Sequence, residues 1–192
     1  MLGPAAAAKE EVAHHDLPSV AHPSLACGDM ARLLVVHHSP TRSVQLLTDA
    51  VLAGARHDEI EGVEVVVRHA LEASAEDVLA ADGYVLGTPA NFGYMSGALK
   101  HFFDSTFLQI GGALDESGGA DASSGATAKR PFALYVHGRY DTTGAVRAVL
   151  AITGALGWRQ GYDVLEVLGD VGDADTESAT ELGGTIAALL TT

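Results

Sequence analysis

Short aliphatic runs alternate with amphipathic stretches along most of the chain. Aliphatic runs bounded by glycine, proline or polar residues are typical of buried strands, whereas apolar residues spaced three and four apart predict helices. The predicted strands lie at residues 33–36, 63–67, 84–86, 132–136 and 164–168. The helices predicted between them lie at about residues 43–57, 74–81, 95–106 and 143–156. Leu182, Ile186 and Leu189 mark a closing helix, in which the pair Gly183-Gly184 predicts fraying.

This alternation of strands and helices predicts the fold class. Strands separated by helices form a parallel sheet that is covered by helices on both faces, which is a three-layer α/β/α sandwich. Right-handed crossovers leave few topologies, and we expect five parallel strands in the order 2-1-3-4-5. A six-stranded Rossmann order remains open at this point. In the order 2-1-3-4-5 the loops after the first and third strands face one crevice, where ligands bind in such sheets.

The start of the chain and one internal stretch depart from the alternation. Residues 1–29 lack sustained periodicity and predict a flexible N-terminal extension, followed by one domain at residues 30–192. Translation could instead begin at Met30, directly before the first strand. Residues 109–130 are rich in Gly, Ala, Ser and Asp, which predicts a long surface insertion in that domain.

Charge and cysteine content narrow the range of partners. The 192 residues include 11 basic and 25 acidic ones, for a net charge of −14. Because no basic patch is visible, we expect neither nucleic acid nor an anionic membrane as a partner. No apolar run is long enough to span a membrane, and the N-terminus does not fit a signal peptide. The single cysteine, Cys27, fits a reducing compartment. We therefore expect the protein to act in the cytoplasm. The spacing of Cys27 from His14, His15 and His22 matches no zinc pattern, and no metal site is expected.

A polar loop joins the first predicted strand to the first predicted helix. Ser39, Thr41 and Ser43 place hydroxyls beside the free amides of a helix N-terminus, and together these groups form a cup for a dianionic phosphate. Arg42 adds a forked donor, and Val44 can offer its backbone amide. Ordinary N-capping by Thr41 or Ser43 is an alternative interpretation.

Two further loops follow the third and fourth predicted strands. The candidate ligand contacts in the first of them are Thr88, Pro89, Ala90, Asn91, Phe92 and Gly93. Its backbone and its aromatic rings suit a flat ligand such as a flavin, although a plain turn with buried aromatics would look the same. The candidate contacts in the second are His137, Gly138, Arg139, Tyr140 and Thr143. Tyr140 would stack on the opposite face of the ligand, whereas His137 is either a ligand contact or a satisfied histidine at a strand end.

The third strand and the helix after it resemble a known family. The residues that carry the resemblance are the run Ala81–Pro89 and then Phe92, Gly93, Met95, Gly97, Lys100, Phe103, Asp104 and Thr106. They are similar to the NAD(P)H:quinone oxidoreductase branch of the flavodoxin-like family, the tryptophan-repressor-binding-protein group. The similarity in element order spans most of residues 31–190. It implies a flavodoxin-like fold, bound FMN and transfer of reducing equivalents from NAD(P)H to quinones.

The resemblance also implies roles for the three loops. By position, residues 39–44 would hold the FMN phosphate, residues 88–93 would line the isoalloxazine ring, and residues 137–143 would close its other side. Arg42 stands where the family has glycine, and Arg139-Tyr140-Asp141 replaces a glycine-rich run of the family.

Three functions are compatible with these features. The leading hypothesis is an FMN-dependent oxidoreductase that transfers electrons from NAD(P)H to a quinone or similar small-molecule acceptor, with no protein acid or base required. The second is a flavodoxin-like electron carrier without NAD(P)H activity of its own, whose acidic charge suits basic redox partners. The third is a flavin-free domain kept for protein contacts. A homodimer or a homotetramer remains open as the assembly.

Overall fold

The computed structural model describes residues 30–112 and 125–191, and the predicted extension and the centre of the predicted insertion lie outside them. The elements follow in the order β1 (Ala31–His37), α1 (Arg42–Ala55), β2 (Val63–His69), α2 (Ala75–Leu79), β3 (Gly83–Asn91), β4 (Tyr94–Met95), α3 (Gly97–Thr106), β5 (Pro131–Gly138), α4 (Thr143–Ala155), β6 (Arg159–Gln160), β7 (Leu165–Leu168) and α5 (Asp173–Ala188). Among the described residues, no helix combines the length and the hydropathy that a membrane crossing would require.

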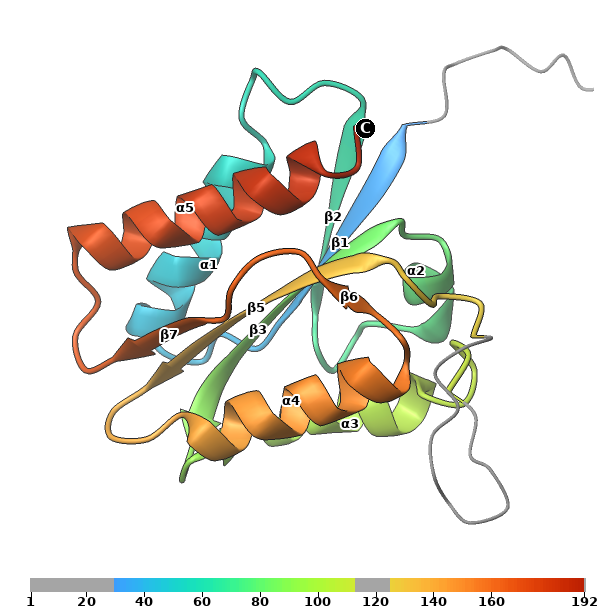
Figure 1. The fold of residues 1–192 in the computed structure, drawn as a ribbon. Coiled ribbons are helices and arrows are strands. Elements are labelled where there is room, and N and C mark those ends of the chain that lie inside the picture. Colours follow the sequence, from blue (N-terminus) through green and yellow to red (C-terminus); the bar gives the residue numbers. More distant parts are fainter. Residues whose placement is uncertain (1–29, 113–124, 192) are drawn as a thin grey trace, which may run out of the picture.

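The central sheet has the predicted flavodoxin-like order. Strands β2, β1, β3 and β5 lie side by side in parallel, and β6 and β7 share the outer edge of β5 (Figure 1). The fifth predicted position is therefore divided, because β6 pairs with the start of β5 and β7 pairs with its end. One further short strand, β4, pairs with β3 in the antiparallel direction. The parallel sheet and its order 2-1-3-4-5 are confirmed, and the strand count differs because the fifth position is divided and β4 is added.

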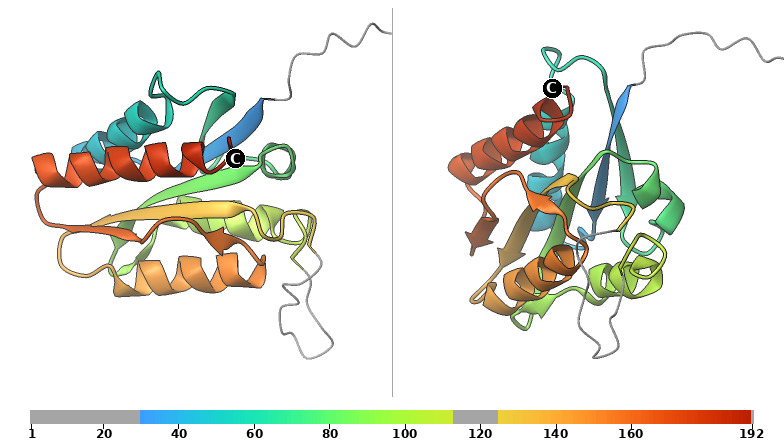
Figure 2. Two further views of the ribbon diagram at one scale, coloured as in Figure 1. Left: turned by 45° about the horizontal axis from the view of Figure 1, so that its top comes forward. Right: turned by 45° about the vertical axis from the view of Figure 1, so that its right-hand side comes forward.

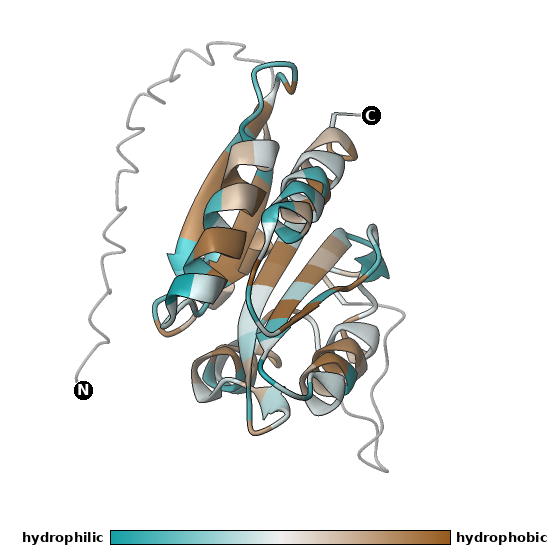
Figure 3. Cartoon of the chain, turned by 90° about the vertical axis from the view of Figure 1, so that its left-hand side faces the viewer, coloured by the Kyte–Doolittle hydropathy of each residue, from teal (hydrophilic) through white to brown (hydrophobic). Residues whose placement is uncertain are grey.

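Helices cover both faces of the sheet, as the pattern of apolar residues predicts. On one face, α1 and α5 pack on side chains such as Leu33 and Val35. On the other face, α2, α3 and α4 pack on the alternate side chains Leu34 and Val36 (Figure 2). The strands are largely hydrophobic between these layers (Figure 3), because strands of a covered parallel sheet are buried on both sides.

Helices α1 and α5 approach each other unusually closely. A Cβ atom on Gly54 would lie 1.8 Å from the carbonyl oxygen of Thr180, and one on Gly183 would lie 2.0 Å from that of Val51. Glycine is therefore needed at both contact points, since any side chain there would push the helices apart. Helix α5 continues through Gly183 and Gly184 without a break, so the prediction of fraying at this pair is wrong.

The described ends of the predicted insertion are anchored in the core. Thr127 is fully buried, donates a hydrogen bond to the Ile110 carbonyl at 2.8 Å, and accepts one from Trp158 Nε1 at 2.9 Å. Trp158 in turn stacks on Tyr84, with ring centroids 4.0 Å apart. This arrangement fixes where the insertion leaves and rejoins the sandwich, at the end of the sheet opposite the carboxyl ends of the strands (Figure 1).

Candidate functional site

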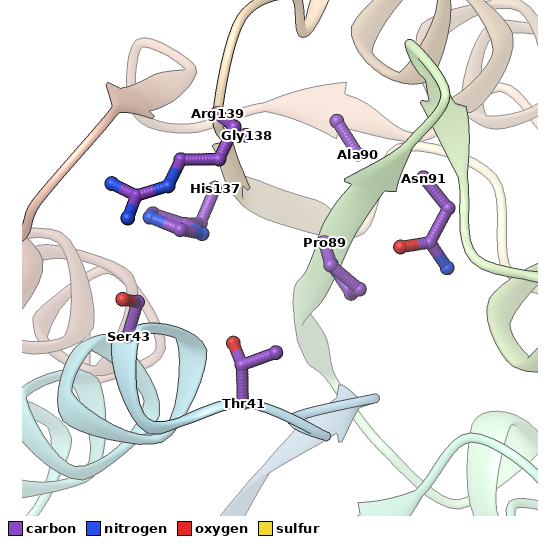
Figure 4. Close-up of a pocket in the computed structure, with 8 residues that line it drawn as sticks. All are labelled: Thr41, Ser43, Pro89, Ala90, Asn91, His137, Gly138 and Arg139. Carbon is purple, nitrogen blue, oxygen red and sulfur yellow. The ribbon is translucent and has the colours of Figure 1, made fainter.

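The carboxyl ends of β1, β3 and β5 meet at a pocket of about 330 Å³. It is lined by Thr41, Ser43, Pro89, Ala90, Asn91, His137, Gly138 and Arg139. In Figure 4 the hydroxyls of the α1 start lie on one side, and the ends of β3 and β5 lie on the others. The volume is at the lower end of the range of about 300–1,000 Å³ that is usual for small-molecule sites. All eight residues belong to the three loops that the sequence singles out.

The N-terminus of α1 forms the polar wall of this pocket. Thr41 is the N-cap, and its hydroxyl oxygen accepts a long hydrogen bond of 3.5 Å from the Val44 amide. The amides of the first helical turn have no carbonyl partner within the helix, and the helix dipole adds positive potential there. Arg42 is exposed at the first helical position, and no hydrogen bond or ion pair holds its side chain within the described residues. The loop therefore combines ordinary N-capping with the features of an anion site, so the two interpretations of the sequence are compatible.

The segment after β3 is a hairpin rather than the predicted open loop. Strand β3 continues to Asn91, and a tight turn at Phe92 and Gly93 leads into β4. Both turn residues have positive φ angles, of 53° and 78°, which glycine tolerates and phenylalanine rarely adopts. Met95 consequently lies in β4, and α3 begins at Gly97 rather than at the predicted position near residue 95.

Thr88 plays a structural part in this hairpin. It is fully buried, its hydroxyl donates to the Pro89 carbonyl at 3.0 Å, and the same oxygen accepts from the Ser96 amide at 3.0 Å. Ser96 is the N-cap of α3. Thr88 therefore links the end of β3 to the start of α3.

The loop after β5 supplies the third wall. His137 is buried, and its Nε2 atom donates to the Gly169 carbonyl at 2.8 Å. Arg139 forms an ion pair with Asp170 at 2.6 Å, but both side chains are largely exposed, so this pair contributes little to stability. His137 is thus a satisfied histidine at a strand end that also lines the pocket, and its role as a ligand contact stays a prediction.

A second pocket, of about 390 Å³, adjoins the first. Its lining consists of Ala90, Phe92, Gly93, Arg139, Tyr140 and Asp141, so it shares Ala90 and Arg139 with the first pocket. Phe92 is fully exposed and Tyr140 is 93% exposed, which is unusual for large aromatic side chains. We call these two adjoining pockets the cleft. The hydroxyls of Thr41 and Ser43 lie at its α1 end, and the exposed rings of Phe92 and Tyr140 lie at its hairpin end.

Asp141 orders the loop between these aromatics. Its Oδ1 atom accepts from the Thr143 amide at 2.9 Å at the start of α4, and this hydrogen bond lowers the pKa of the carboxyl group below its usual value. A Cβ atom on Gly93 would lie 2.9 Å from Asp141 Oδ2, so the two loops touch across the second pocket. Thr143 holds Asp141 through both its backbone amide and its side chain, and it is not among the residues that line the two pockets.

Three histidines cluster beside the loop that joins β1 to α1. His69 at the end of β2 makes edge contacts with His37 and His38, with ring centroids 6.1 and 5.3 Å away. Burial lowers the pKa of both His37 and His38, and the nearby His69 lowers both further. Within residues 30–112 and 125–191, no group of histidine, cysteine and carboxylate side chains has the geometry of a metal site.

The structure brings most of the predicted site residues together and sets five aside from the cleft lining. Those five are Ser39, Arg42, Val44, Thr88 and Thr143. Val44 and Thr88 are fully buried, and the hydroxyl of Ser39 is engaged by His37 and Thr48. Asp141 and Asp170 were not singled out from the sequence. An aspartate two residues before a helix start is a recognisable capping signal, whereas nothing in the sequence pairs Asp170 with Arg139.

The chain is similar to several known proteins. A family model described as NADPH-dependent FMN reductase matches residues 47–166, which include the β3–β4 hairpin and the loop after β5. A flavodoxin of Aquifex aeolicus is 38% identical over 86 residues, which cover 45% of each protein. An NAD(P)H dehydrogenase (quinone) of Acidithiobacillus ferrooxidans is 32% identical over 97 residues, which cover 40% of this chain and 48% of that protein. The chain thus spans about half the length of these curated relatives.

Solved structures support the same fold. A flavodoxin from the domain Archaea superposes with a TM-score of 0.67 at 17% identity, over 84% of this chain and 99% of the other. A WrbA-like flavodoxin from Agrobacterium tumefaciens superposes with a TM-score of 0.63 at 18% identity, over 84% and 98%. At this level of identity the superpositions establish the flavodoxin-like fold.

Proposed function

The chain belongs to the NADPH-dependent FMN reductase family, and from this premise we propose that it is an FMN-dependent oxidoreductase that transfers electrons from NAD(P)H to a quinone or a similar small acceptor. The observation that carries the proposal is the cleft that changes from polar to aromatic along the carboxyl edge of the sheet. FMN has a matching division, with a phosphate at one end and a flat ring system at the other.

The polar end of the cleft fits a phosphate. Thr41 and Ser43 present hydroxyls there, and the α1 dipole and first-turn amides attract an anion without a lysine. Arg42 has no partner within the described part of the chain and supplies a charged donor close by. These groups would fix one end of the cofactor despite the net charge of −14.

The aromatic end fits a flat ring system. The exposed rings of Phe92 and Tyr140 would lose their contact with water against such a ring, and the backbone of Pro89–Asn91 would meet its edge. The redox chemistry would come from bound FMN, which accepts a hydride and passes electrons on. The residues of this chain would bind and orient the cofactor and limit the access of water, and no side chain is required as acid or base.

Reconstitution tests this proposal. The purified chain is mixed with FMN, freed of excess cofactor, and assayed for NADH and NADPH consumption with a set of quinones. We expect a yellow protein that consumes at least one of the two reductants when a quinone is present. A yellow protein that consumes neither reductant with any quinone would refute the enzymatic proposal.

A flavodoxin-like electron carrier is the second candidate. It is favoured by the 38% identity to a flavodoxin and by the excess of 25 acidic over 11 basic residues, which suits docking to basic redox proteins. A carrier loaded with FMN would resist reduction by NADPH, yet after chemical reduction with dithionite it would pass electrons to a basic acceptor such as cytochrome c. Rapid reduction by NADPH would count against this candidate.

The cellular location and the oligomeric state of the protein can also be proposed. We propose the cytoplasm as its place of action, because the chain has a single cysteine and such usage fits a reducing compartment. A homodimer or homotetramer is the assembly that we propose to test, by sedimentation equilibrium of the FMN-loaded chain.

A further inference from the structure

We infer that Thr48 and Tyr135 are positioning residues of the phosphate-binding loop, and that the hydroxyl of Ser39 is committed to them rather than to the ligand. The inference rests on the proposed FMN site and deepens it. It concerns a chain of hydrogen bonds beneath the loop, made by side chains that do not line the cleft.

The chain of hydrogen bonds runs from the loop into the core. His37 Nδ1 lies 2.9 Å from Ser39 Oγ, and Ser39 Oγ lies 2.7 Å from Thr48 Oγ1. Thr48 Oγ1 lies 2.6 Å from the Tyr135 hydroxyl and 2.8 Å from the Val44 carbonyl oxygen. Four side chains from β1, the loop, α1 and β5 are thereby joined through one central threonine.

The direction of each hydrogen bond follows from counting hydrogens. The Val44 carbonyl can only accept, so Thr48 gives its single hydroxyl hydrogen to it. Thr48 must then accept from both Ser39 and Tyr135, using its two lone pairs. Ser39, having donated inward, accepts from the N–H of His37 Nδ1. All four contacts are satisfied only in this arrangement.

This count changes the role expected of Ser39. Its one hydroxyl hydrogen points to Thr48, so it has none to give to a phosphate above the loop. Phosphate recognition therefore falls to the amides at the start of α1, to the hydroxyls of Thr41 and Ser43, and to Arg42. Ser39 instead anchors the loop from below, and its carbonyl also accepts from Gln45 Nε2 at 3.2 Å.

The buried end of the chain is held rigidly. Tyr135 and Thr48 are 0% and 4% exposed, and burial raises the pKa of the Tyr135 hydroxyl so that it remains a neutral donor. The Tyr135 ring passes directly over Gly87 of β3. The loop is also fixed from β3, because the His38 amide donates to the Gly87 carbonyl at 3.0 Å. Strands β3 and β5 thus set the height of the loop relative to the sheet.

The test compares FMN with riboflavin, which has the same ring and ribityl chain but no phosphate. Thr48→Val removes the central hydroxyl and keeps the shape of the side chain, and Tyr135→Phe removes the donor from β5. We expect the dissociation constant of FMN, measured by fluorescence quenching, to rise about 3- to 10-fold in each variant, the change that corresponds to one ordinary hydrogen bond. The dissociation constant of riboflavin should stay unchanged, because the ring end of the cleft is untouched.

Two control variants separate positioning from general destabilisation. Tyr84→Phe removes another fully buried tyrosine hydroxyl, which donates to the Val78 carbonyl at 2.9 Å at the opposite end of the sheet. It should lower the melting temperature without changing the affinity for FMN. Thr48→Ser keeps the hydroxyl and should restore the affinity that Thr48→Val loses.

The outcomes distinguish this inference from the proposal on which it rests. If the wild-type chain does not bind FMN, both are refuted. If the wild type binds FMN and Thr48→Val and Tyr135→Phe bind it equally well, the inference alone is refuted. A double-mutant cycle tests the commitment of Ser39: the losses from Ser39→Ala and Thr48→Val should be less than additive, because both remove one shared bond. Additive losses would show that Ser39 acts independently of Thr48 and would refute its commitment to that residue.

Discussion

Tyr135 lies so close to Gly87 that a Cβ atom on this glycine would be 2.1 Å from both the Cζ atom and the hydroxyl oxygen of the tyrosine. The contact joins neighbouring strands at the centre of the sheet, where both residues are fully enclosed. The hydroxyl of this tyrosine lies 2.6 Å from Thr48 Oγ1, beneath the loop that joins β1 to α1.

Gly87→Ala should therefore destabilise the protein. Overpacking a rigid core costs about 1–3 kcal/mol of unfolding free energy, and we expect a loss in this range by urea denaturation. Gly97→Ala is the matched control, because a Cβ atom on Gly97 would meet nothing within 4 Å. Equal stability of the two variants would show that the sheet accommodates the extra methyl group.

Arg42→Ala should weaken FMN without affecting riboflavin. A charge-assisted hydrogen bond is worth about 1.5–3 kcal/mol, so the affinity for FMN should fall by that amount if the unpaired guanidinium meets the phosphate. Arg56→Ala, at the exposed C-terminal end of the same helix, is the matched control and should bind FMN like the wild type. Unchanged binding by Arg42→Ala would place the phosphate out of reach of this side chain.

The exposed rings of Phe92 and Tyr140 should affect FMN and riboflavin alike, in contrast to Arg42. Tyr140→Ala and Phe92→Ala should each weaken FMN and riboflavin equally, by about 0.5–1.5 kcal/mol beyond the loss of buried area, because both ligands carry the same ring. Since these side chains are exposed in the free protein, its melting temperature should hardly change. Tyr140→Phe retains the ring and should retain the affinity, so a large loss in this variant would implicate the hydroxyl instead.

The histidine cluster predicts a pH dependence of stability. Burial and the nearby His69 lower the pKa values of His37 and His38 below 6.5, so at pH values below 6.5 the unfolded chain binds more protons than the folded one. The free energy of unfolding should then decrease as the pH falls from 6.5 through the folded-state pKa values, and it should be independent of these groups above 6.5.

A single substitution isolates this effect. His69→Asn removes the repulsive charge and keeps a side-chain acceptor for the Leu71 amide, which His69 Nδ1 binds at 3.3 Å. The decrease in unfolding free energy should be smaller in this variant when urea denaturation is repeated at several pH values. An identical pH profile in the two proteins would contradict the coupling between the rings.

The sequence predicts the sandwich well because hydrophobic alternation reports burial directly. Val85 and Leu86 are buried on opposite faces of the sheet, as an aliphatic run in a covered strand requires. The β3–β4 hairpin escapes prediction because its turn places Phe92 at a positive φ angle, which the residue type does not suggest. The three loops are found because polar residues follow the ends of the strands at one edge of the sheet.

The interior of the site is harder to predict than its rim. Thr48 is a polar residue on the buried face of α1, between Leu47 and Val51, and this is the signal that could have revealed the hydrogen bonds beneath the loop. Nothing along the chain indicates its partner, because Tyr135 is 87 residues away. Ser39 has the residue type of a phosphate ligand, and only its neighbours in space reveal the inward hydrogen bond.

Reduction of bound FMN by NADPH distinguishes the proposed oxidoreductase from an electron carrier. The FMN-loaded protein is mixed with NADPH under anaerobic conditions while the visible absorption band of the oxidised flavin is recorded. We predict that the band bleaches and that a quinone, added afterwards, restores it. A band that persists with NADPH but bleaches with dithionite would contradict the proposed oxidoreductase.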